Sequence, residues 1–249
     1  MTVETATVPE GHRVYAIGDI HGRADLLTTL HRDILVDAAN AGPGTRKIAI
    51  YLGDYLDRGL QSREVIDLLL DQPLPDFASI HLRGNHEHEA MAFLREPARG
   101  ATWLRYGGDA TLYSYGVRLP AETPPEERLE VLSKSLLAAM PTRHRAFLEA
   151  LPLAWELGDY FFVHAGVDPD KALDRQDAAD MMWIREPFLE AECDFGKVVV
   201  HGHSVTEVPD VRDNRIGIDT GACFTNTLTS LVLEGGSRRF LSTRPARPA

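Results

Sequence analysis

The residues best suited to chemistry in this chain form five short clusters of histidine, aspartate and asparagine beside glycine. They read Gly-Asp-Ile-His-Gly, Gly-Asp-Tyr-Leu-Asp-Arg-Gly, Arg-Gly-Asn-His-Glu, His-Ala-Gly and His-Gly-His, at residues 18–22, 53–59, 83–87, 164–166 and 201–203. Carboxylate, imidazole and amide donors without thiolate suit Mn²⁺, Fe or Zn²⁺. These donors exceed the needs of one ion and predict two ions that share a carboxylate. Asp54 is the expected bridge, because ligand groups lie on either side of it in the sequence.

Each of these residues taken alone has an ordinary explanation. A single Gly-Asp after a strand, such as that at Asp19, is usually a turn, and a single histidine at a strand end is usually a hydrogen-bonded structural group. Because five clusters recur in this way, a metal site is favoured over chance. We assign the structural role to the histidines outside the clusters: His12, His31, His81, His88 and His144.

Short apolar segments precede the clusters and predict strands buried on both faces. In open α/β sheets ligands gather beyond the carboxyl ends of the strands, so the clusters are expected to meet there. Helical periodicity between the early strands predicts α/β layers, whereas the late strands predict a second, more antiparallel sheet. The expected strands are 14–17, 48–52, 79–82, 160–163, 197–200, 216–218 and 227–233, and the expected helices are 24–39, 62–70, 123–139 and 141–151.

Composition and charge narrow the classes of function. The net charge of -11 argues against binding to nucleic acid or to an anionic membrane. The apolar runs are too short to span a bilayer, and the first residues do not resemble a secretory signal. Only Cys193 and Cys223 occur, so neither a disulfide framework nor a thiolate metal site is expected. A reducing, cytoplasmic location fits these features.

The ordered motifs Gly-Asp-x-His-Gly, Gly-Asp-x-x-Asp-Arg-Gly and Gly-Asn-His-Glu resemble the signature of the phosphoprotein phosphatase family, in its compact bacterial serine/threonine form. The later His-Ala-Gly and Gly-His segments fit as well, so the match runs from about residue 14 to 221. The resemblance implies an α/β metallophosphoesterase-type four-layer α/β/β/α sandwich, with two mixed sheets flanked by helices. We expect one domain over residues 1–249, with a core of about 12–234, loose tails at 1–11 and 235–249, and a helical flank at about 95–151 without a polar cluster of its own.

The same resemblance implies two divalent metal ions, with Mn²⁺ expected and Fe or Zn²⁺ accepted by the same donors. One group of ligands would be Asp19, His21 and Asp54. His201 is chemically as good a ligand as His203, and the family pattern selects His203. The second group would then be Asp54, Asn85, His164 and His203.

A hydroxide shared by the two ions would attack phosphorus in line. His86 would act as general acid, and Asp57 would orient it unless Asp57 forms only a salt bridge to Arg58. Arg58, Arg185 and Asn85 would bind the phosphoryl oxygens, the alternative for Arg185 being an ordinary surface arginine.

The expected substrate is a phosphorylated protein or a small phosphoester. Symmetrical dinucleoside tetraphosphate hydrolases are the alternative, but they usually lack the acid found at Asp57 and end the third motif in Asp rather than Glu87. A catalytically silent metal-binding scaffold is disfavoured, because His86, Asp57 and Arg58 are all present. The extended C-terminal loop of eukaryotic relatives, with its tyrosine, is not recognisable after Asp219.

Overall fold

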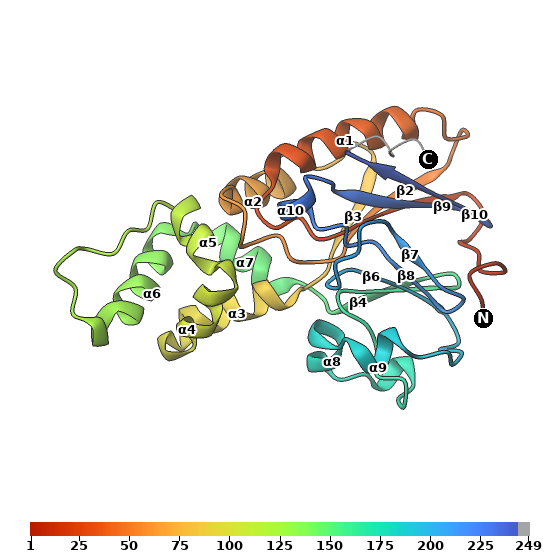
Figure 1. Cartoon of the computed structure of the whole chain (residues 1–249). Coiled ribbons are helices and arrows are strands. Elements are labelled where there is room, and N and C mark those ends of the chain that lie inside the picture. Colours follow the sequence, from red (N-terminus) through yellow and green to blue (C-terminus); the bar gives the residue numbers. More distant parts are fainter. Residues whose placement is uncertain (244–249) are drawn as a thin grey trace.

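Two five-stranded sheets, stacked face to face, form the centre of the computed structural model, which describes residues 1–243 (Figure 1). Each sheet contains parallel and antiparallel pairs of strands. The first sheet has the order β10 (Ser237–Ser242), β9 (Thr229–Glu234), β1 (His12–Ile17), β2 (Arg46–Tyr51) and β3 (Phe77–His81). The second has the order β4 (Ala154–Leu157), β5 (Tyr160–Val163), β6 (Val198–His201), β8 (Arg215–Gly217) and β7 (Asp210–Val211).

Helices cover the outer faces of both sheets and extend to one side as a flank (Figure 1). Over the first sheet lie α1 (Ala24–Ala38) and α2 (Ser62–Asp71), and beneath the second lie α8 (Ala178–Trp183) and α9 (Glu186–Leu189). The flank comprises α3 (Asn85–Arg95), α4 (Gly100–Trp103), the π-helical turn η2 (Leu104–Gly108), α5 (Asp109–Ser114), α6 (Arg128–Ala139) and α7 (Thr142–Ala150). The 3₁₀ turns η1 (Pro97–Arg99), η3 (Pro125–Glu127) and η4 (Leu173–Arg175) and the short α10 (Ala222–Thr225) complete the elements. The predicted α/β sandwich is thereby confirmed.

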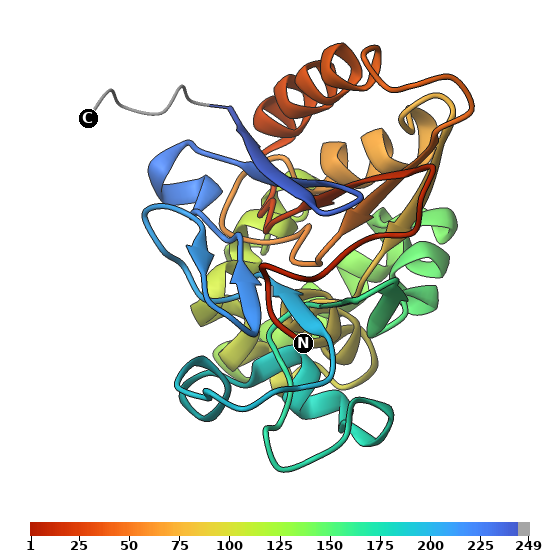
Figure 2. The ribbon, with the colours of Figure 1, turned by 90° about the vertical axis from the view of Figure 1, so that its right-hand side faces the viewer.

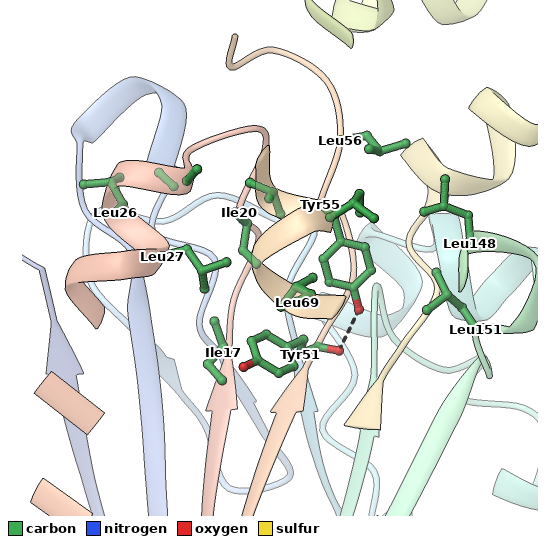
Figure 3. Packing of buried hydrophobic residues seen from close by; sticks show 14 of the residues in the cluster. Ile17, Ile20, Leu26, Leu27, Tyr51, Tyr55, Leu56, Leu69, Leu148 and Leu151 are labelled. Atoms are coloured by element: carbon green, nitrogen blue, oxygen red, sulfur yellow. Dashed lines mark hydrogen bonds between the residues drawn. The ribbon is translucent and has the colours of Figure 1, made fainter. Parts of the chain in front are cut away.

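The strands are apolar on both faces because each sheet is covered on both sides. In β1, Val14 and Ala16 pack between the two sheets, whereas Tyr15 and Ile17 belong to the core beneath the helices. Figure 3 shows Ile17 and Leu27 in that helical core, together with a hydrogen bond in which the Tyr55 hydroxyl donates to the Tyr51 carbonyl at 3.4 Å. This packing holds the strand ends in place, and the loops that follow the strands inherit that position.

Strands β1, β2 and β3 run parallel, and so do β5, β6 and β8. Parallel strands end at one edge of their sheet, so the loops after them are neighbours. Backbone hydrogen bonds join these loops: Gly202 N–H donates to the His164 carbonyl at 2.8 Å, and His21 N–H donates to the Asp54 carbonyl at 2.8 Å. The clusters seen in the sequence therefore meet at one edge of the sandwich.

Some expectations about the fold were wrong. Within the expected C-terminal tail, residues 237–242 form β10, because the chain reverses at Gly235, whose φ is +53°, and pairs with β9. Residues 244–249 of that tail lie outside the described part. The N-terminal tail is also not loose, since Val3, Ala6 and Val8 are buried against the core between the sheets. The strand expected at 227–233 lies in the first sheet, antiparallel to β1, and not in the second.

Two smaller features of the flank and the helices complete the fold. The helix expected from residue 123 begins at Arg128 after η3, and the Thr123 hydroxyl donates to the Pro120 carbonyl instead of capping it. None of the helices in residues 1–243 is both long and apolar enough to cross a bilayer.

Candidate metal centre

The loops that carry the site turn sharply, and the residues at the turns are themselves candidate site residues. His21, Asp54, Asp57, Arg58 and His203 all have positive φ, between 46° and 71°. This left-handed conformation is uncommon for residues other than glycine and costs roughly 1–3 kcal/mol in unfavourable cases. The surrounding contacts must therefore hold these residues in place, as is typical of functional sites.

Glycines allow these loops to approach one another. A Cβ atom at Gly84 would lie 2.1 Å from Asp54 Oδ1, and one at Gly202 would lie 2.1 Å from Asp19 Oδ1. Either distance is far below van der Waals contact, so these two glycines of the clusters are required by the packing of the carboxylates.

Glu87 fixes the loop that carries Asp54. Its buried carboxylate accepts hydrogen bonds from the backbone N–H groups of Gly84, Asp54, Tyr55 and Leu56 at 3.0, 2.8, 2.8 and 3.2 Å. Sequence reasoning used Glu87 only to separate branches of the family and missed this positioning role.

Two groups of potential metal ligands share one carboxylate. His21, Asp54 and His86 form the first, and Asp54, His164 and His203 form the second; in each group the ligand atoms lie within 4.8 Å of one another. All five residues are buried. Asp54 belongs to both groups, and its role as a carboxylate that bridges two ions stays a prediction.

The tautomers of the histidines follow from their hydrogen bonds. His21 Nδ1 lies 2.9 Å from the Leu56 carbonyl, and His164 Nδ1 lies 3.0 Å from the Leu52 carbonyl. A carbonyl can only accept, so Nδ1 carries the proton in both rings, and Nε2 is left with a lone pair directed into the site. Metal-binding histidines commonly donate their second N–H to a backbone carbonyl in this way.

The donor set fits a cation better than it fits protein contacts alone. His164 Nε2 faces Asn85 Oδ1 at 2.9 Å, so two acceptor atoms oppose each other, and the buried His203 Nε2 has no hydrogen-bond partner among residues 1–243. Burial lowers the pKa of His21 to about 3 and that of His203 to about 2, which keeps both rings neutral and able to bind a metal. These residues could therefore hold divalent ions.

Asp19 and His201 occupy positions different from the central groups. Both Asp19 carboxylate oxygens accept from the His203 backbone N–H, at 3.1 and 3.2 Å, so Asp19 borders the site without belonging to either group. His201 packs edge-on against Phe188, with 4.9 Å between ring centroids, and lies outside both groups. Of the two histidines, His203 lies in a candidate ligand group, and its choice over His201 as a metal ligand stays a prediction.

Asp219 is a further buried carboxylate that sequence reasoning missed. One of its oxygens accepts from Gly221 N–H at 2.9 Å, and the other has no hydrogen-bond partner in the described residues. Burial and the negative charge of Asp54 raise the pKa of Asp219 to about 6, while Gly221 opposes the shift. Asp219 lies two residues after β8 and two residues before Gly221, so it also follows a strand and has glycine nearby, as the five clusters do.

Asp57 and His86 form a hydrogen-bonded pair that is shielded from solvent. His86 Nδ1 lies 2.7 Å from Asp57 Oδ2, and Trp103 Nε1 donates to the same oxygen at 2.8 Å. The Thr111 hydroxyl donates to Asp57 Oδ1 at 2.6 Å. Burial lowers the pKa of His86, but Asp54 and the hydrogen bond to Asp57 raise it more, to about 9. The flank thus contributes polar groups that its sequence did not reveal, contrary to expectation.

Arg58 and Arg185 both line a pocket of about 600 Å³ beside His203. Arg58 Nη1 lies 2.8 Å from His21 Nε2 and its Nη2 lies 3.2 Å from His86 Nε2, so its guanidinium reaches both imidazoles. Arg185 Nη1 donates to Ser204 Oγ at 3.1 Å. A third arginine, Arg105 of the flank, lines the same pocket and was not predicted.

The histidines outside the five clusters, which were expected to have structural roles, and the two cysteines lie apart from the candidate ligand groups. The Tyr51 hydroxyl lies 2.8 Å from His31 Nε2, the Tyr115 hydroxyl lies 2.8 Å from His144 Nδ1, and His81 stacks on Tyr51. His12 and His88 also lie outside both ligand groups. Both cysteines are free, and the Cys223 thiol donates to the His21 carbonyl at 2.9 Å.

Comparison with known proteins agrees with this geometry. Serine/threonine-protein phosphatase 2 of Escherichia coli is 36% identical over 97 residues, covering 39% of this chain and 38% of that enzyme. The asymmetrical bis(5'-nucleosyl)-tetraphosphatase PrpE of Bacillus subtilis is 27% identical over 233 residues, covering 86% of this chain and 87% of PrpE. This chain spans less than half the length of the serine/threonine phosphatases that it matches.

A solved structure shares the fold over nearly the whole chain. It is provisionally described as a diadenosine tetraphosphatase, and it superposes with a TM-score of 0.64 at 20% identity, over 95% of this chain and 96% of that one. The family model for calcineurin-like phosphoesterases, enzymes that use divalent metals, matches residues 12–219. With this match and the shared carboxylate at Asp54, the chain belongs to the calcineurin-like phosphoesterase family.

Proposed function

We propose that this phosphoesterase is a serine/threonine protein phosphatase that depends on two divalent ions, with Mn²⁺ as the expected metal. The observation that carries the proposal is the pair of ligand groups that share Asp54, next to the hydrogen-bonded pair of Asp57 and His86. The proposed ligands are Asp19, His21 and Asp54 for one ion and Asp54, Asn85, His164 and His203 for the other. When bound, two such ions would lower the pKa of water at the site and neutralise phosphoryl charge.

The side chains of the site provide the remaining steps. Arg58 and Arg185, two cations on the wall of one pocket, would hold the phosphoryl oxygens through charge-assisted hydrogen bonds. Asn85, whose side chain faces His164, would bind a phosphoryl oxygen as well as a metal. These contacts would align phosphorus with the attacking water and counter the repulsion expected from a protein with a net charge of -11.

His86 would protonate the leaving oxygen. Its Nδ1 is bound to Asp57, so a proton on Nε2 would be directed into the site. Serine and threonine alkoxides are poor leaving groups and need such a proton, so the Asp57–His86 pair supports a substrate of this class. Trp103 and Thr111 occupy the other hydrogen-bonding positions of the Asp57 carboxylate, and the described residues include no ion pair between Asp57 and Arg58.

Hydrolysis of a dinucleoside polyphosphate is the second candidate. It is supported by the likeness to PrpE, which extends over 86% of this chain, whereas the likeness to the E. coli serine/threonine phosphatase extends over 39%. The alternative expected from the sequence was a symmetrical dinucleoside tetraphosphate hydrolase, whereas PrpE is named as an asymmetrical one.

The deciding experiment compares kcat/KM of the Mn²⁺-loaded enzyme on a phosphothreonine peptide and on diadenosine tetraphosphate. A preference for the peptide is expected. A preference for the dinucleotide would overturn the protein phosphatase assignment and leave the proposed metal chemistry intact. The metal content of the wild type, measured in parallel, should be two ions per chain.

A further inference from the structure

The pocket beside the metal centre is larger than a phosphoryl group requires. Its volume of about 600 Å³ is within the roughly 300–1,000 Å³ of pockets that bind whole small molecules. Arg58 and His203 of the candidate centre line the pocket, and so do Arg105, Tyr106 and Phe224. The part of a substrate beyond its phosphoryl group therefore has room within the same pocket.

This pocket carries more positive charge than one phosphoryl group needs. Arg58, Arg105 and Arg185 all line it, and none of the lining side chains in the described part of the chain is acidic. Arg58 lies 2.8 Å from His21 Nε2 and 3.2 Å from His86 Nε2, and Arg185 donates to Ser204, whereas Arg105 is exposed and has no such partner within residues 1–243. Three neighbouring guanidinium groups repel one another, so their arrangement favours a ligand with more than one anionic group.

The segment that carries Arg105 is fixed to the proposed catalytic residues at both ends. The buried Trp103 donates to Asp57, and the Gly107 carbonyl accepts from Arg58 N–H at 3.0 Å. Gly107 has a φ of 106°, and a Cβ atom there would lie 2.9 Å from Arg58. Between these anchors the helical backbone of η2 is interrupted by a kink at Gly107. Arg105 is thus presented to the pocket from a fixed position.

Exposed aromatic rings form part of the same walls. Tyr106 is 53% exposed and Phe224 is 69% exposed, and the Phe224 ring lies 5.8 Å from the Arg58 guanidinium carbon. Aromatic rings that face solvent in a ligand pocket are surfaces on which flat or apolar groups pack. Phe224 comes from α10, far from the flank in sequence, so the two walls are brought together only by the fold.

From these features we propose that Arg105, flanked by Tyr106 and Phe224, forms a subsite for a second anionic group beside the scissile phosphoryl group. The subsite deepens the proposed phosphatase function and rests on it. Its ligand is a phosphate of a phosphate chain or the carboxylate of an acidic residue next to a phosphorylated one. Binding at Arg105 selects such substrates over simple phosphomonoesters.

The test compares Arg105→Gln with the wild type on four substrates. They are a phosphothreonine peptide with glutamate two residues after the phosphothreonine, the same peptide with glutamine there, diadenosine tetraphosphate, and p-nitrophenyl phosphate. Loss of one charge-assisted hydrogen bond at an exposed site should lower kcat/KM about tenfold on a substrate with the second anion. On the glutamine peptide and p-nitrophenyl phosphate the change should be less than about twofold.

Two further variants control for side effects. Arg105→Lys keeps the charge and should retain most of the selectivity. Arg118→Gln removes an exposed arginine of the same flank that does not line the pocket, and should behave as the wild type on all four substrates. A loss on the glutamate peptide alone identifies a carboxylate ligand, and a loss on the dinucleotide alone identifies a phosphate chain. Equal losses on all substrates, or none on both anionic ones, overturn the subsite.

A binding measurement separates this proposal from the protein phosphatase assignment. Titration calorimetry with inorganic pyrophosphate and with inorganic phosphate needs no turnover. Arg105→Gln should weaken binding of pyrophosphate about tenfold and leave phosphate binding unchanged. If the wild type cleaves neither peptide, the serine/threonine assignment fails, while the pyrophosphate result still decides the subsite: equal affinities of the two proteins for pyrophosphate would refute it.

Discussion

Thr111 offers a direct test of whether the flank controls the chemistry. Its hydroxyl donates to Asp57 Oδ1 at 2.6 Å and lies 2.9 Å from both Asp57 N and Ser62 Oγ. Thr111→Val replaces the hydroxyl with a methyl group of similar shape, so packing is nearly preserved. The change leaves Asp57 Oδ1, in a side chain with no exposure, without its hydroxyl donor.

The expected cost follows from this geometry. A hydrogen bond to a charged group contributes about 1.5–3 kcal/mol, so the free energy of unfolding should fall by about 2 kcal/mol. The catalytic effect acts through His86, which Asp57 orients from 2.7 Å away. Loss of such an orienting partner typically costs about 10- to 100-fold in activity. We expect this loss in kcat on a phosphothreonine peptide, whose leaving alkoxide needs a proton.

The assay sets Thr111→Val against Thr111→Ser, which keeps the hydroxyl, on a phosphothreonine peptide and on p-nitrophenyl phosphate. The good leaving group needs little protonation, so Thr111→Val should lose much less on it. Metal content and thermal unfolding are measured for both variants. If Thr111→Val lost equally on the two substrates with normal metal content, or if Thr111→Ser failed to restore the peptide rate, the role assigned to the flank would be refuted.

Other consequences of the structure can be checked in the same way. Asp54→Asn should lose the metal pair, because Asp54 belongs to both ligand groups, and two ions per chain by elemental analysis would contradict the shared carboxylate. His86→Asn should keep its metals yet lose about 10²–10⁴-fold on poor leaving groups and far less on good ones, and equal losses would argue against a general acid. Gly202→Ala should lower metal content, since its Cβ would meet Asp19 Oδ1 at 2.1 Å, whereas Gly42→Ala, with its nearest atom at 3.7 Å, should not. Burial lowers the pKa of His31 to about 4, so the unfolded chain binds more protons below about pH 6.5 and stability falls as the pH drops toward 4. The free energy of unfolding, measured with urea, should fall between pH 7 and pH 5 by about 2 kcal/mol less in His31→Gln than in the wild type. Glutamine keeps an acceptor for Tyr51, and an equal fall in the two proteins would contradict this.

Much of the candidate site could be predicted because its candidate ligands are encoded locally. Asp54 and His203 each sit at a sharp turn directly after a strand, with glycine beside them, and both conditions are visible in a short stretch of sequence. The glycines reflect the same constraint, since side chains at Gly84 or Gly202 would collide with the carboxylates. The spacing of the residues within each motif therefore indicates how their side chains are arranged at the candidate centre.

The surroundings of these ligands could not be predicted in this way. Trp103 and Thr111 reach Asp57 from positions 46 and 54 residues away, and neither residue type signals such a role by itself. Arg105 lies in the flank, for which the sequence predicted helices and no polar cluster. Only the fold places it in the pocket with Arg58. The C-terminal hairpin was missed for a related reason, because every residue of β10 is exposed or only partly buried, and the strand depends on β9 as its partner.

The strained backbone of the site explains why the candidate ligands could be predicted from the sequence and their surroundings could not. His21, Asp54, Asp57, Arg58 and His203 are all left-handed, and the local preference of Asp and His for this region is too weak to maintain five such turns. The contacts that hold them come from elsewhere in the chain: Glu87 binds the backbone of the Asp54 loop, and Thr111 binds both the backbone and the side chain of Asp57. The candidate ligands can therefore be predicted from motifs, but their precise orientation is set by long-range contacts. For this reason residues 103–111 of the flank, none of which is a proposed metal ligand, are expected to control both the rate and the selectivity of the enzyme.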